Sequence, residues 1–531
     1  MEEREPSVEK EATRKTLFGR SEEWLARHTL LLALVILGLG LVLRLHFITA
    51  CYLNPDEAIH ILLGRHANLD EAYQDSLTQA HPPLLTVVLY FLQHLGHGVF
   101  LLRLPNLVAA TLGTWFLYRW CRDLFGKGAA LGLLILLTFS PAMFLPAVEI
   151  RQYGLLILGI GGALLGLERA FTRVSVKWLV WGNLGLCVAL LSHYSAIWVV
   201  ASLGCWGLLR LVRQPPGRRF VLTWTGFQLL FLLLYLLFYF THVRQMQNDW
   251  MQEFAVTDYL REGYPQEGNH SLLAFFGDGL VGIFGYLGGG RGAGLAGALF
   301  FAASLAALAL VPIRPVGERR RDLVLLLSLP LLLGALGTIL ELQPFKGSRH
   351  TTYLLPFLAA GIAFLLLRWV RYPVLAAMVA GLLGVAPLAL SFDGPAYELN
   401  NDPITLPRQD LERALTFVLE EGPAERLLIT DYQTSVELRF YLGKRMPKHL
   451  VAQPWVLNEE NFPPLVRMAK HSCGVRPGDR LWAVSTCWRT YPPLTEVIPG
   501  EMVVRAEQFG RISLVQFRVP ARYPRGDRRD G

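Results

Sequence analysis

The sequence predicts an α-helical polytopic membrane protein with about eleven transmembrane helices, followed by a small C-terminal α/β domain. Two observations predict the membrane part. Of the 531 residues, 53% are hydrophobic and only 17% are charged, and the apolar residues form long runs separated by short basic gaps. A third observation predicts the domain: from Ser391 onward charge rises, apolar runs shorten and turn residues such as Asp393, Gly394 and Pro395 appear.

The apolar runs divide the membrane part into spans, because a helix needs about 20 apolar residues to cross the hydrocarbon of a bilayer. We expect residues 1–28 to form a cytoplasmic tail and residues 29–390 to form the transmembrane module. The predicted spans are Leu30 to Thr49, Leu102 to Tyr118, Ala129 to Ala147, Leu155 to Leu167, Trp178 to Leu191, Ala196 to Leu209, Phe220 to Phe240, Leu295 to Pro312, Leu323 to Leu340, Tyr353 to Leu367 and Val374 to Leu390.

Two further apolar stretches, Pro82 to Leu95 and Ser271 to Leu287, are expected to lie in the membrane interface or to re-enter it. If neither stretch crosses, the basic residues fall in every second gap, as the positive-inside rule requires. This topology places the first loop, residues 50–101, on the outer side. It makes the C-terminal domain, residues 391–531, external as well.

Polar residues gather on the outer side, and the first loop begins with Asp56 and Glu57. Two interpretations of this pair stay open. The acids begin an amphipathic interfacial helix, or one carboxylate takes a proton from an attacking hydroxyl group. His81 precedes two prolines that suit the first turn of the next helix, and its imidazole is a candidate donor to a phosphate oxygen.

Glu149, Arg151 and Tyr153 interrupt two apolar runs with almost no loop between them. Charged residues this close to hydrocarbon are costly unless they are paired or functional. One interpretation is a Glu149–Arg151 ion pair, and the other is a lipid phosphate bound by the planar guanidinium of Arg151. His193, in the shortest outer gap, is interpreted as a helix-end feature.

A second cationic group lies in a late outer loop and consists of Lys346, Arg349 and His350. External basic residues depart from the positive-inside pattern. We therefore expect these three residues to bind an anion.

The C-terminal domain is expected to alternate helices and strands and to end in a disordered basic tail, Arg522 to Arg529. Its two cysteines, Cys473 and Cys487, either form a disulfide in an oxidising compartment or stay free. The predicted helices are Leu411 to Glu420 and Val436 to Tyr441, and the predicted strands are Leu427 to Thr430, Leu481 to Val484 and Ile512 to Phe517.

Composition also argues against several classes of protein. The net charge is +8, but the basic residues occupy the gaps between spans, which indicates membrane orientation and not nucleic-acid binding. The cysteines have no CxxC spacing and no His/Cys metal spacing, so we expect no zinc or redox site and no cofactor. A divalent metal stays compatible with the sequence.

These motifs resemble the GT-C glycosyltransferases related to dolichyl-phosphate-mannose protein mannosyltransferases and bacterial lipid A aminoarabinose transferases. The resemblance covers residues 29–390 and implies the GT-C type of fold. The residues that carry it are the acids Asp56 and Glu57, the run His81-Pro82-Pro83-Leu84, the run Arg103-Leu104-Pro105, the Glu-x-Arg-x-Tyr of residues 149–153, and Arg349 and His350 followed by Tyr353 and Pro356.

The resemblance implies an inverting transfer of a sugar from a polyprenyl-phosphate donor to an acceptor hydroxyl on the outer face. It assigns Asp56 as the catalytic aspartate and Glu57 as its support. His81 stands where relatives often have lysine, and because histidine is fully charged only when protonated, this departure bears on how strongly it binds phosphate. The residues implied to bind the phosphate are His81, Arg151, Tyr153 and Arg349, beside Glu149, which stands where some relatives have a second acid.

Other functions were weighed against this one. A flippase or transporter for lipid-linked sugars would need polar residues along several spans, and these spans are nearly bare of them. An O-antigen-ligase or polymerase type of enzyme is marked by a large late loop rich in arginine and histidine. We expect a bacterial inner membrane as the location, while the sugar, the prenyl length and the acceptor stay open.

Overall fold

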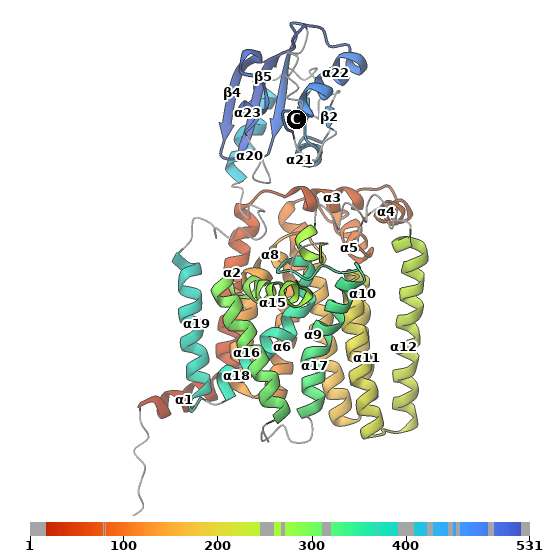
Figure 1. Ribbon diagram of the computed structural model, residues 1–531, viewed down its shortest axis with the longest axis vertical. Coiled ribbons are helices and arrows are strands. Elements are labelled where there is room, and N and C mark those ends of the chain that lie inside the picture. Colours follow the sequence, from red (N-terminus) through yellow and green to blue (C-terminus); the bar gives the residue numbers. More distant parts are fainter. Residues whose placement is uncertain are drawn as a thin grey trace, which may run out of the picture.

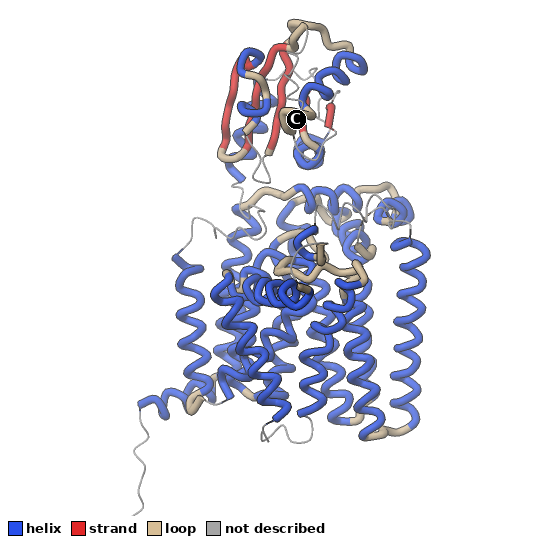
Figure 2. The backbone as a smooth tube through the Cα atoms, in the orientation of Figure 1, coloured by secondary structure: helices blue, strands red, loops and turns tan. Residues whose placement is uncertain are grey.

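The computed structural model describes residues 17–77, 79, 81–244, 260–266, 271–310, 320–368, 370–390, 408–421, 428–443, 450–452, 457–486 and 493–521. A bundle of long helices forms the larger part, and the strands lie in a separate domain stacked on one end of the bundle (Figures 1 and 2). The predicted class, a helical membrane protein with a small C-terminal α/β domain, is confirmed.

The predicted spans coincide with observed helices, because long apolar runs form helices wherever a bilayer leaves the backbone no other hydrogen-bond partner. The run from 129 to 147 is divided into two helices. The helices are α2 (Thr29–Ala50), α6 (Val99–Phe125), α7 (Lys127–Phe139), α8 (Pro141–Val148), α9 (Tyr153–Arg173), α10 (Val176–Ser192), α11 (Ala196–Arg213), α12 (Arg218–Phe238), α16 (Arg291–Leu310), α17 (Arg320–Ile339), α18 (Leu355–Arg368) and α19 (Pro373–Leu390).

A count by length and hydropathy alone does not include every predicted span. In the part of the chain that is described, seven helices are long and apolar enough to cross a membrane, and α7 with α8, bent by 70°, make an eighth if they form one span. The predicted eleven included α10 and α18, which have 17 and 14 residues and reach only about 26 and 21 Å. The helices suffice to make the chain an integral membrane protein.

Close helix packing fixes the centre of the bundle around α9. A Cβ atom at Gly113 of α6 would lie 2.7 Å from the Ile157 carbonyl of α9, and one at Gly185 of α10 would lie 2.7 Å from the Ala163 nitrogen of α9. Only glycine lets these backbones approach so closely, which is how small residues hold membrane helices together. The start of α9, at Tyr153, is thereby held in place.

Shorter helices lie at the end of the bundle that bears the C-terminal domain. They are α3 (Pro55–Gly64), α4 (Leu69–Ser76) and α5 (Leu84–Gln93), and they lie across this end in Figure 1. The basic connection between α11 and α12 lies at the opposite end, with α1 (Leu17–Arg27). The two apolar stretches expected not to cross form α5 and α15 (Leu272–Gly288), of 10 and 17 residues.

The C-terminal domain contains both predicted helices and all three predicted strands, together with elements that the sequence did not predict. The tail from Arg522 to Arg529 and Cys487 lie outside the described residues, so the tail and the Cys473–Cys487 pairing stay predictions. The elements are α20 (Arg408–Glu421), β1 (Leu428–Thr430), α21 (Tyr432–Leu442), β2 (Leu450–Ala452), α22 (Phe462–Cys473), β3 (Arg480–Ser485), α23 (Leu494–Val497), β4 (Val503–Phe509) and β5 (Ile512–Arg518).

The strands form one mixed sheet in the order β2-β1-β3-β5-β4. The strand β1 is central and parallel to both neighbours, with Ile429 opposite Val451 and Ala483. The strands β3, β5 and β4 pair antiparallel, and Val515 of β5 stands opposite Ala483. The buried run Leu428 to Thr430 suits this central position, because a strand covered on both faces is continuously apolar.

The helix α21 attaches the C-terminal domain to the first loop of the bundle. The Leu53 amide donates a hydrogen bond to the Tyr441 hydroxyl at 2.9 Å, and the Arg65 guanidinium lies 4.7 Å from the centre of the Phe440 ring. The Tyr52 side chain is buried in the apolar cluster of the C-terminal domain. The segment immediately before Asp56 is therefore held from both sides.

Candidate active site

Asp56 lies in the first turn of α3, whose start is set by local sequence. Pro55 occupies the first helical position, where a missing N–H costs nothing, and the Asn54 side chain accepts a hydrogen bond from the Glu57 amide at 2.8 Å. Glu57 in return accepts one from the Asn54 amide at 3.0 Å, which completes a capping box. Asp56, between these two residues, is 37% exposed.

Glu57 points away from solvent into a buried ion pair with Arg103 of α6. The Arg103 Nε and Nη2 atoms donate to the two Glu57 carboxylate oxygens at 2.8 and 2.7 Å, and both side chains are less than 5% exposed. Arg103 also donates to the carbonyls of Ile48, Cys51 and Tyr52, at 2.9 to 3.0 Å. The guanidinium thus satisfies the C-terminal end of α2.

Glu57 also reaches the segment between α8 and α9, where its carboxylate accepts a hydrogen bond from the Ile150 amide at 2.8 Å. Its two oxygens are therefore shared among Arg103, Asn54 and Ile150. The sequence grouped Glu57 with Asp56 as catalytic. In the structure Glu57 does not face the site, and its contacts hold the segments of Asp56 and Arg151. This geometry suits the supporting role that the resemblance implies for Glu57.

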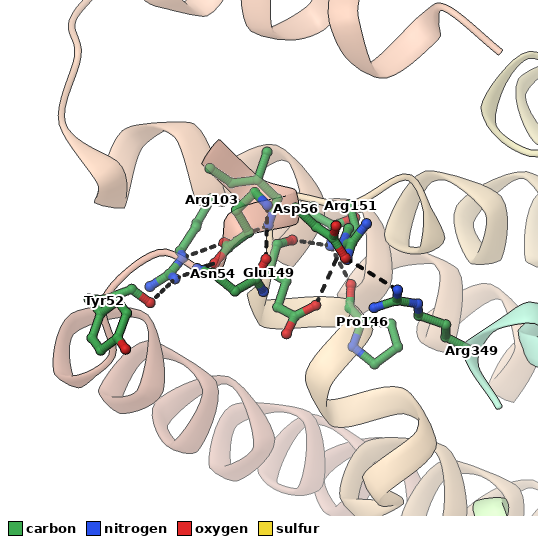
Figure 3. Close-up of polar contacts among 11 residues, drawn as sticks. Tyr52, Asn54, Asp56, Arg103, Pro146, Glu149, Arg151 and Arg349 are labelled. Atoms are coloured by element: carbon green, nitrogen blue, oxygen red, sulfur yellow. Dashed lines mark hydrogen bonds and ion pairs between the residues drawn. The ribbon is translucent and has the colours of Figure 1, made fainter. Parts of the chain in front are cut away.

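Asp56 meets two guanidiniums that come from distant parts of the chain (Figure 3). The Arg151 guanidinium donates a hydrogen bond to the Asp56 carboxylate, and the Arg349 Nη2 atom donates to the same carboxylate oxygen at 3.2 Å. The Arg151 side chain is 6% exposed and the Arg349 side chain 25%. A carboxylate and two cations, one of them accessible, thus form the centre of the site.

Glu149 completes the ring of charges, with a carboxylate oxygen 3.8 Å from the Arg151 Nε atom. Of the two interpretations of this segment, the structure contains the Glu149–Arg151 ion pair, while a lipid phosphate bound by Arg151 stays a prediction. The Asn106 side chain of α6 holds this segment by donating to the carbonyls of Pro146 and Glu149. Arg151 lies at the start of α9, whose positive dipole end adds to the local field.

Lys346 and His350 flank Arg349 but have different surroundings. Lys346 is partly exposed and donates to the Glu262 carboxylate, so it has an acidic partner away from Asp56. His350 is buried, its carbonyl accepts a hydrogen bond from the Gln343 side chain at 3.0 Å, and burial and the charge of Arg349 hold its pKa well below the ordinary value. Because Lys346 pairs with Glu262 and not with Asp56, it is not part of the charged centre formed by Asp56, Arg151 and Arg349.

His81 belongs to a group of buried aromatic and imidazole rings beside the charged centre. Its ring centre lies 5.9 Å from that of His60 and 5.5 Å from that of His193, and His193 lies 5.3 Å from the ring of Tyr153. No sequence pattern indicated a role for His60, and His193 was interpreted only as a helix-end feature. Their grouping depends on how α3, α10 and α9 pack, which spacing along the chain does not encode.

The imidazoles of this group are neutral. Burial lowers the pKa of His60 and of His193 to about 4. Burial, the neighbouring imidazoles and Arg349 hold the pKa of His81 well below its ordinary value. His81 therefore acts through a hydrogen bond and not through a charge at pH 7.

A pH-dependent loss of stability follows from the buried His60. Its pKa is about 4 in the folded protein and about 6.5 in an unfolded chain, so the unfolded state binds more protons between these values and the folded state loses stability as pH falls below 6.5. Between pH 7 and pH 5 we expect wild type to lose about 2 kcal/mol more than His60→Gln. Unfolding in detergent at both pH values measures this, and equal losses in the two proteins would contradict it.

Within the described ranges, no group of three or more His, Cys, Asp or Glu side chains is arranged to hold a metal ion. The arrangement of Asp56, Arg151 and Arg349 can bind an anion and hold a carboxylate beside it. Such a pairing suits a reaction in which one group loses a proton while another leaves with negative charge.

Comparison with known proteins relates part of the chain to a family. Residues 80–244 match the family model described as dolichyl-phosphate-mannose-protein mannosyltransferase. The match covers less than a third of the chain; it includes His81, Arg151 and Tyr153 but neither Asp56 nor Arg349. No curated protein matches the chain in sequence.

Solved structures give weaker likenesses over most of the chain. Crystal structures of ArnT from Cupriavidus metallidurans, bound to undecaprenyl phosphate and in the apo state, are 15% and 16% identical, with TM-scores of 0.47 and 0.40. The alignments cover 93% and 94% of this chain and 98% of each ArnT chain. The cryo-EM structure of the arabinofuranosyltransferase AftD from Mycobacteria is 14% identical, with a TM-score of 0.44, and the alignment covers 92% of this chain and 40% of AftD.

The family match falls on the part of the chain that contains the Glu-x-Arg-x-Tyr motif and the His-Pro-Pro-Leu run. It confirms the resemblance predicted from these motifs and supports the general kind of enzyme that they imply, a membrane glycosyltransferase. Residues 80–244 are thus similar to the family described as dolichyl-phosphate-mannose-protein mannosyltransferase.

Proposed function

We propose that this chain transfers a sugar from a polyprenyl-phosphate donor to an acceptor hydroxyl, with inversion, at the end of the bundle that bears the C-terminal domain. The observation that carries the proposal is the position of Asp56 between Arg151 and Arg349. The family description, which names a dolichyl-phosphate sugar, supports the class of donor.

The charges of the site suit this reaction. Displacement at the anomeric carbon of the sugar develops positive charge on the sugar and negative charge on the departing phosphate. Arg151 and Arg349 stabilise the phosphate, and Arg151 offers the planar fork that suits bidentate binding of its oxygens. Asp56 takes the proton from the acceptor hydroxyl as the new bond forms.

Arg349 links the two halves of this mechanism. Its side chain is more exposed than that of Arg151, and its hydrogen bond to Asp56 is 3.2 Å long. A phosphate that reaches Arg349 competes with Asp56 for the same guanidinium, which leaves the carboxylate with one cationic neighbour fewer and makes it a stronger base. Binding of the donor thus prepares the base.

The other candidate residues have supporting parts. Glu57 positions Asp56 through the α3 cap and Arg103. Glu149 orients Arg151 through its ion pair. Tyr153 and His81 line the buried side of the phosphate site and offer polar groups without adding charge.

The location follows from the same proposal. Basic connections lie at the end of the bundle opposite the site, so the positive-inside rule puts the site on the outer face of the membrane. In a bacterium this is the periplasmic face of the inner membrane, where lipid-linked sugars meet acceptors. The C-terminal domain lies on the same face as the site.

The test is a panel of radiolabelled polyprenyl-phosphate sugars offered to the purified protein in nanodiscs, with release of polyprenyl phosphate as the measurement. Release that requires an acceptor supports a transferase. Donor that crosses the bilayer of proteoliposomes without release of polyprenyl phosphate would instead identify a flippase.

Arg349→Gln is expected to raise the Kd for polyprenyl phosphate about 10- to 100-fold, because a hydrogen bond to a charged group contributes about 1.5–3 kcal/mol. Lys346→Gln is the matched control. It removes a cation from the same loop, but this cation pairs with Glu262 and not with Asp56. Its Kd should equal that of wild type. Equal losses in the two variants would show that the loop acts only through its overall charge.

A further inference from the structure

The side chain of His193 has a tautomer that its neighbours determine. The Ser195 backbone amide donates to the His193 Nδ1 atom at 3.1 Å, and the Ser195 hydroxyl lies 2.8 Å from the same atom. A backbone N–H can only donate, so Nδ1 must be the unprotonated acceptor. In the neutral imidazole the proton is therefore on Nε2.

The His193 Nε2–H group is buried and has no hydrogen-bond partner among the described residues. The side chain is 6% exposed, and leaving a buried donor unpaired costs about 1–3 kcal/mol. The His81 Nδ1 atom, in the adjacent ring, also has no partner in the described part of the chain. Two polar atoms in one small region thus have no hydrogen-bond partner among the residues that the structure describes.

This region adjoins the two arginines of the proposed site. The Arg349 charge is close enough to lower the pKa values of His81 and His350. Tyr153, whose ring lies against His193, is only two residues from Arg151. A ligand that satisfies the region must therefore offer acceptor atoms and carry negative charge.

We propose that His193 is a further binding residue for the donor phosphate, to which its Nε2–H group donates a hydrogen bond, with the tautomer held by Ser195. The inference rests on the proposed function and extends it to α10 and α11. The donor phosphate is a diester with two free oxygens, and it becomes a monoester when the sugar leaves, so it engages Arg349 on its accessible side and His193 on its buried side.

A neutral donor has a specific advantage at this position. A third cation would compete with Arg151 and Arg349 for Asp56 and would keep the carboxylate paired. A neutral N–H group stabilises the phosphate oxygen but does not attract the Asp56 carboxylate as a full charge would. His193 therefore discriminates between the leaving group and the base.

Two substitutions of the same residue separate binding from structure. In His193→Gln the side-chain amide reaches the position of Nε2 and keeps a donor there. In His193→Asn the shorter amide reaches the position of Nδ1, keeps an acceptor for the Ser195 amide, and leaves no donor at Nε2. We expect His193→Asn to raise the Kd for polyprenyl phosphate about 10- to 100-fold and His193→Gln to raise it less than about 5-fold.

The experiment measures binding of polyprenyl phosphate and of inorganic phosphate to the full chain in nanodiscs, with unfolding midpoints of both variants. A higher Kd for His193→Asn than for His193→Gln, with equal unfolding midpoints of the two variants, supports the proposal. Three results would mean that His193 only stabilises the junction between α10 and α11: equal affinities of the two variants, a larger loss of affinity in His193→Gln, or a loss of affinity that accompanies a lower unfolding midpoint. A loss confined to inorganic phosphate would overturn the assignment to the lipid.

Arg349→Gln in the same assay separates this inference from the proposed function. If Arg349→Gln loses affinity while both His193 variants bind like wild type, the inference alone fails. If wild type binds no polyprenyl phosphate, or Arg349→Gln binds it like wild type, the proposed function fails and the inference fails with it.

Discussion

Asp56→Asn is expected to lower the rate of sugar transfer by about 10²- to 10⁴-fold, because general base catalysis contributes a factor of this size. The amide keeps the shape of the carboxylate and an oxygen for Arg349, but it cannot accept the proton of the acceptor hydroxyl. Binding of polyprenyl phosphate should persist or become tighter, since Asp56 no longer competes for Arg349 as a charge. Single-turnover transfer and equilibrium binding measure the two effects separately.

Asp70→Asn is the control for this substitution. Asp70 lies in the first turn of the next outer helix, α4, and is exposed, so the same chemical change at the same end of the bundle should leave transfer unchanged. If Asp56→Asn transferred sugar like wild type, the acids of α3 would be interfacial residues and not part of the chemistry.

The Arg103–Glu57 pair should dominate the stability of the outer end of the bundle. Arg103→Met leaves the Glu57 carboxylate buried without its cation, and loss of one partner of a buried pair costs about 3–5 kcal/mol. The carbonyls of Ile48, Cys51 and Tyr52 lose a donor as well. We expect a lower unfolding midpoint in detergent.

Combining Arg103→Met with Glu57→Gln tests the cause of this loss. The double variant removes the unpaired charge and leaves an amide oxygen for one of the two backbone amides that Glu57 accepts from, those of Asn54 and Ile150, so it should recover part of the stability. Arg169→Met is the control, because the Arg169–Asp123 pair at the opposite end is partly exposed and contributes only about 0–1 kcal/mol. A double variant as unstable as Arg103→Met would exclude the buried charge as the cause.

Much of the site was predictable from sequence because membrane topology brings distant residues together. Arg151 and Arg349 follow Asp56 by 95 and 293 residues. The positive-inside pattern nevertheless assigned all three residues to one end of the bundle. The spans were predictable for a similar reason, since a bilayer imposes a long apolar run on each crossing helix. The end of the bundle at which these residues lie was therefore predictable, although the contacts between their side chains were not.

Specific pairings were beyond the sequence. Arg103 was recognised as the opening of a span, but its ion pair with Glu57 depends on the angle at which α3 meets α6. Lys346 and Arg349 are three residues apart in the same loop. Only the folded loop shows that Lys346 pairs with Glu262 and Arg349 with Asp56. The grouping of His60, His81 and His193 likewise joins three segments of the chain whose spacing is not periodic in sequence.

The C-terminal domain shows a different limit. The buried strands β1, β3 and β5 were predicted from their apolar runs. The strand β4 was missed because its residues are largely exposed at the sheet edge, and the missed strand β2 is a three-residue strand at the other edge. Edge strands and very short strands carry little hydrophobic pattern.

The attachment of α21 to the first loop has a consequence for exchange of modules between proteins. Tyr52 is buried among residues of the C-terminal domain, and Tyr441 accepts the hydrogen bond of the Leu53 amide, three residues before Asp56. A chimera with a foreign outer domain would have to supply both a pocket for Tyr52 and an acceptor for Leu53. The C-terminal domain and the first loop would therefore have to be exchanged together, although Leu53 and Tyr441 are 388 residues apart in the chain.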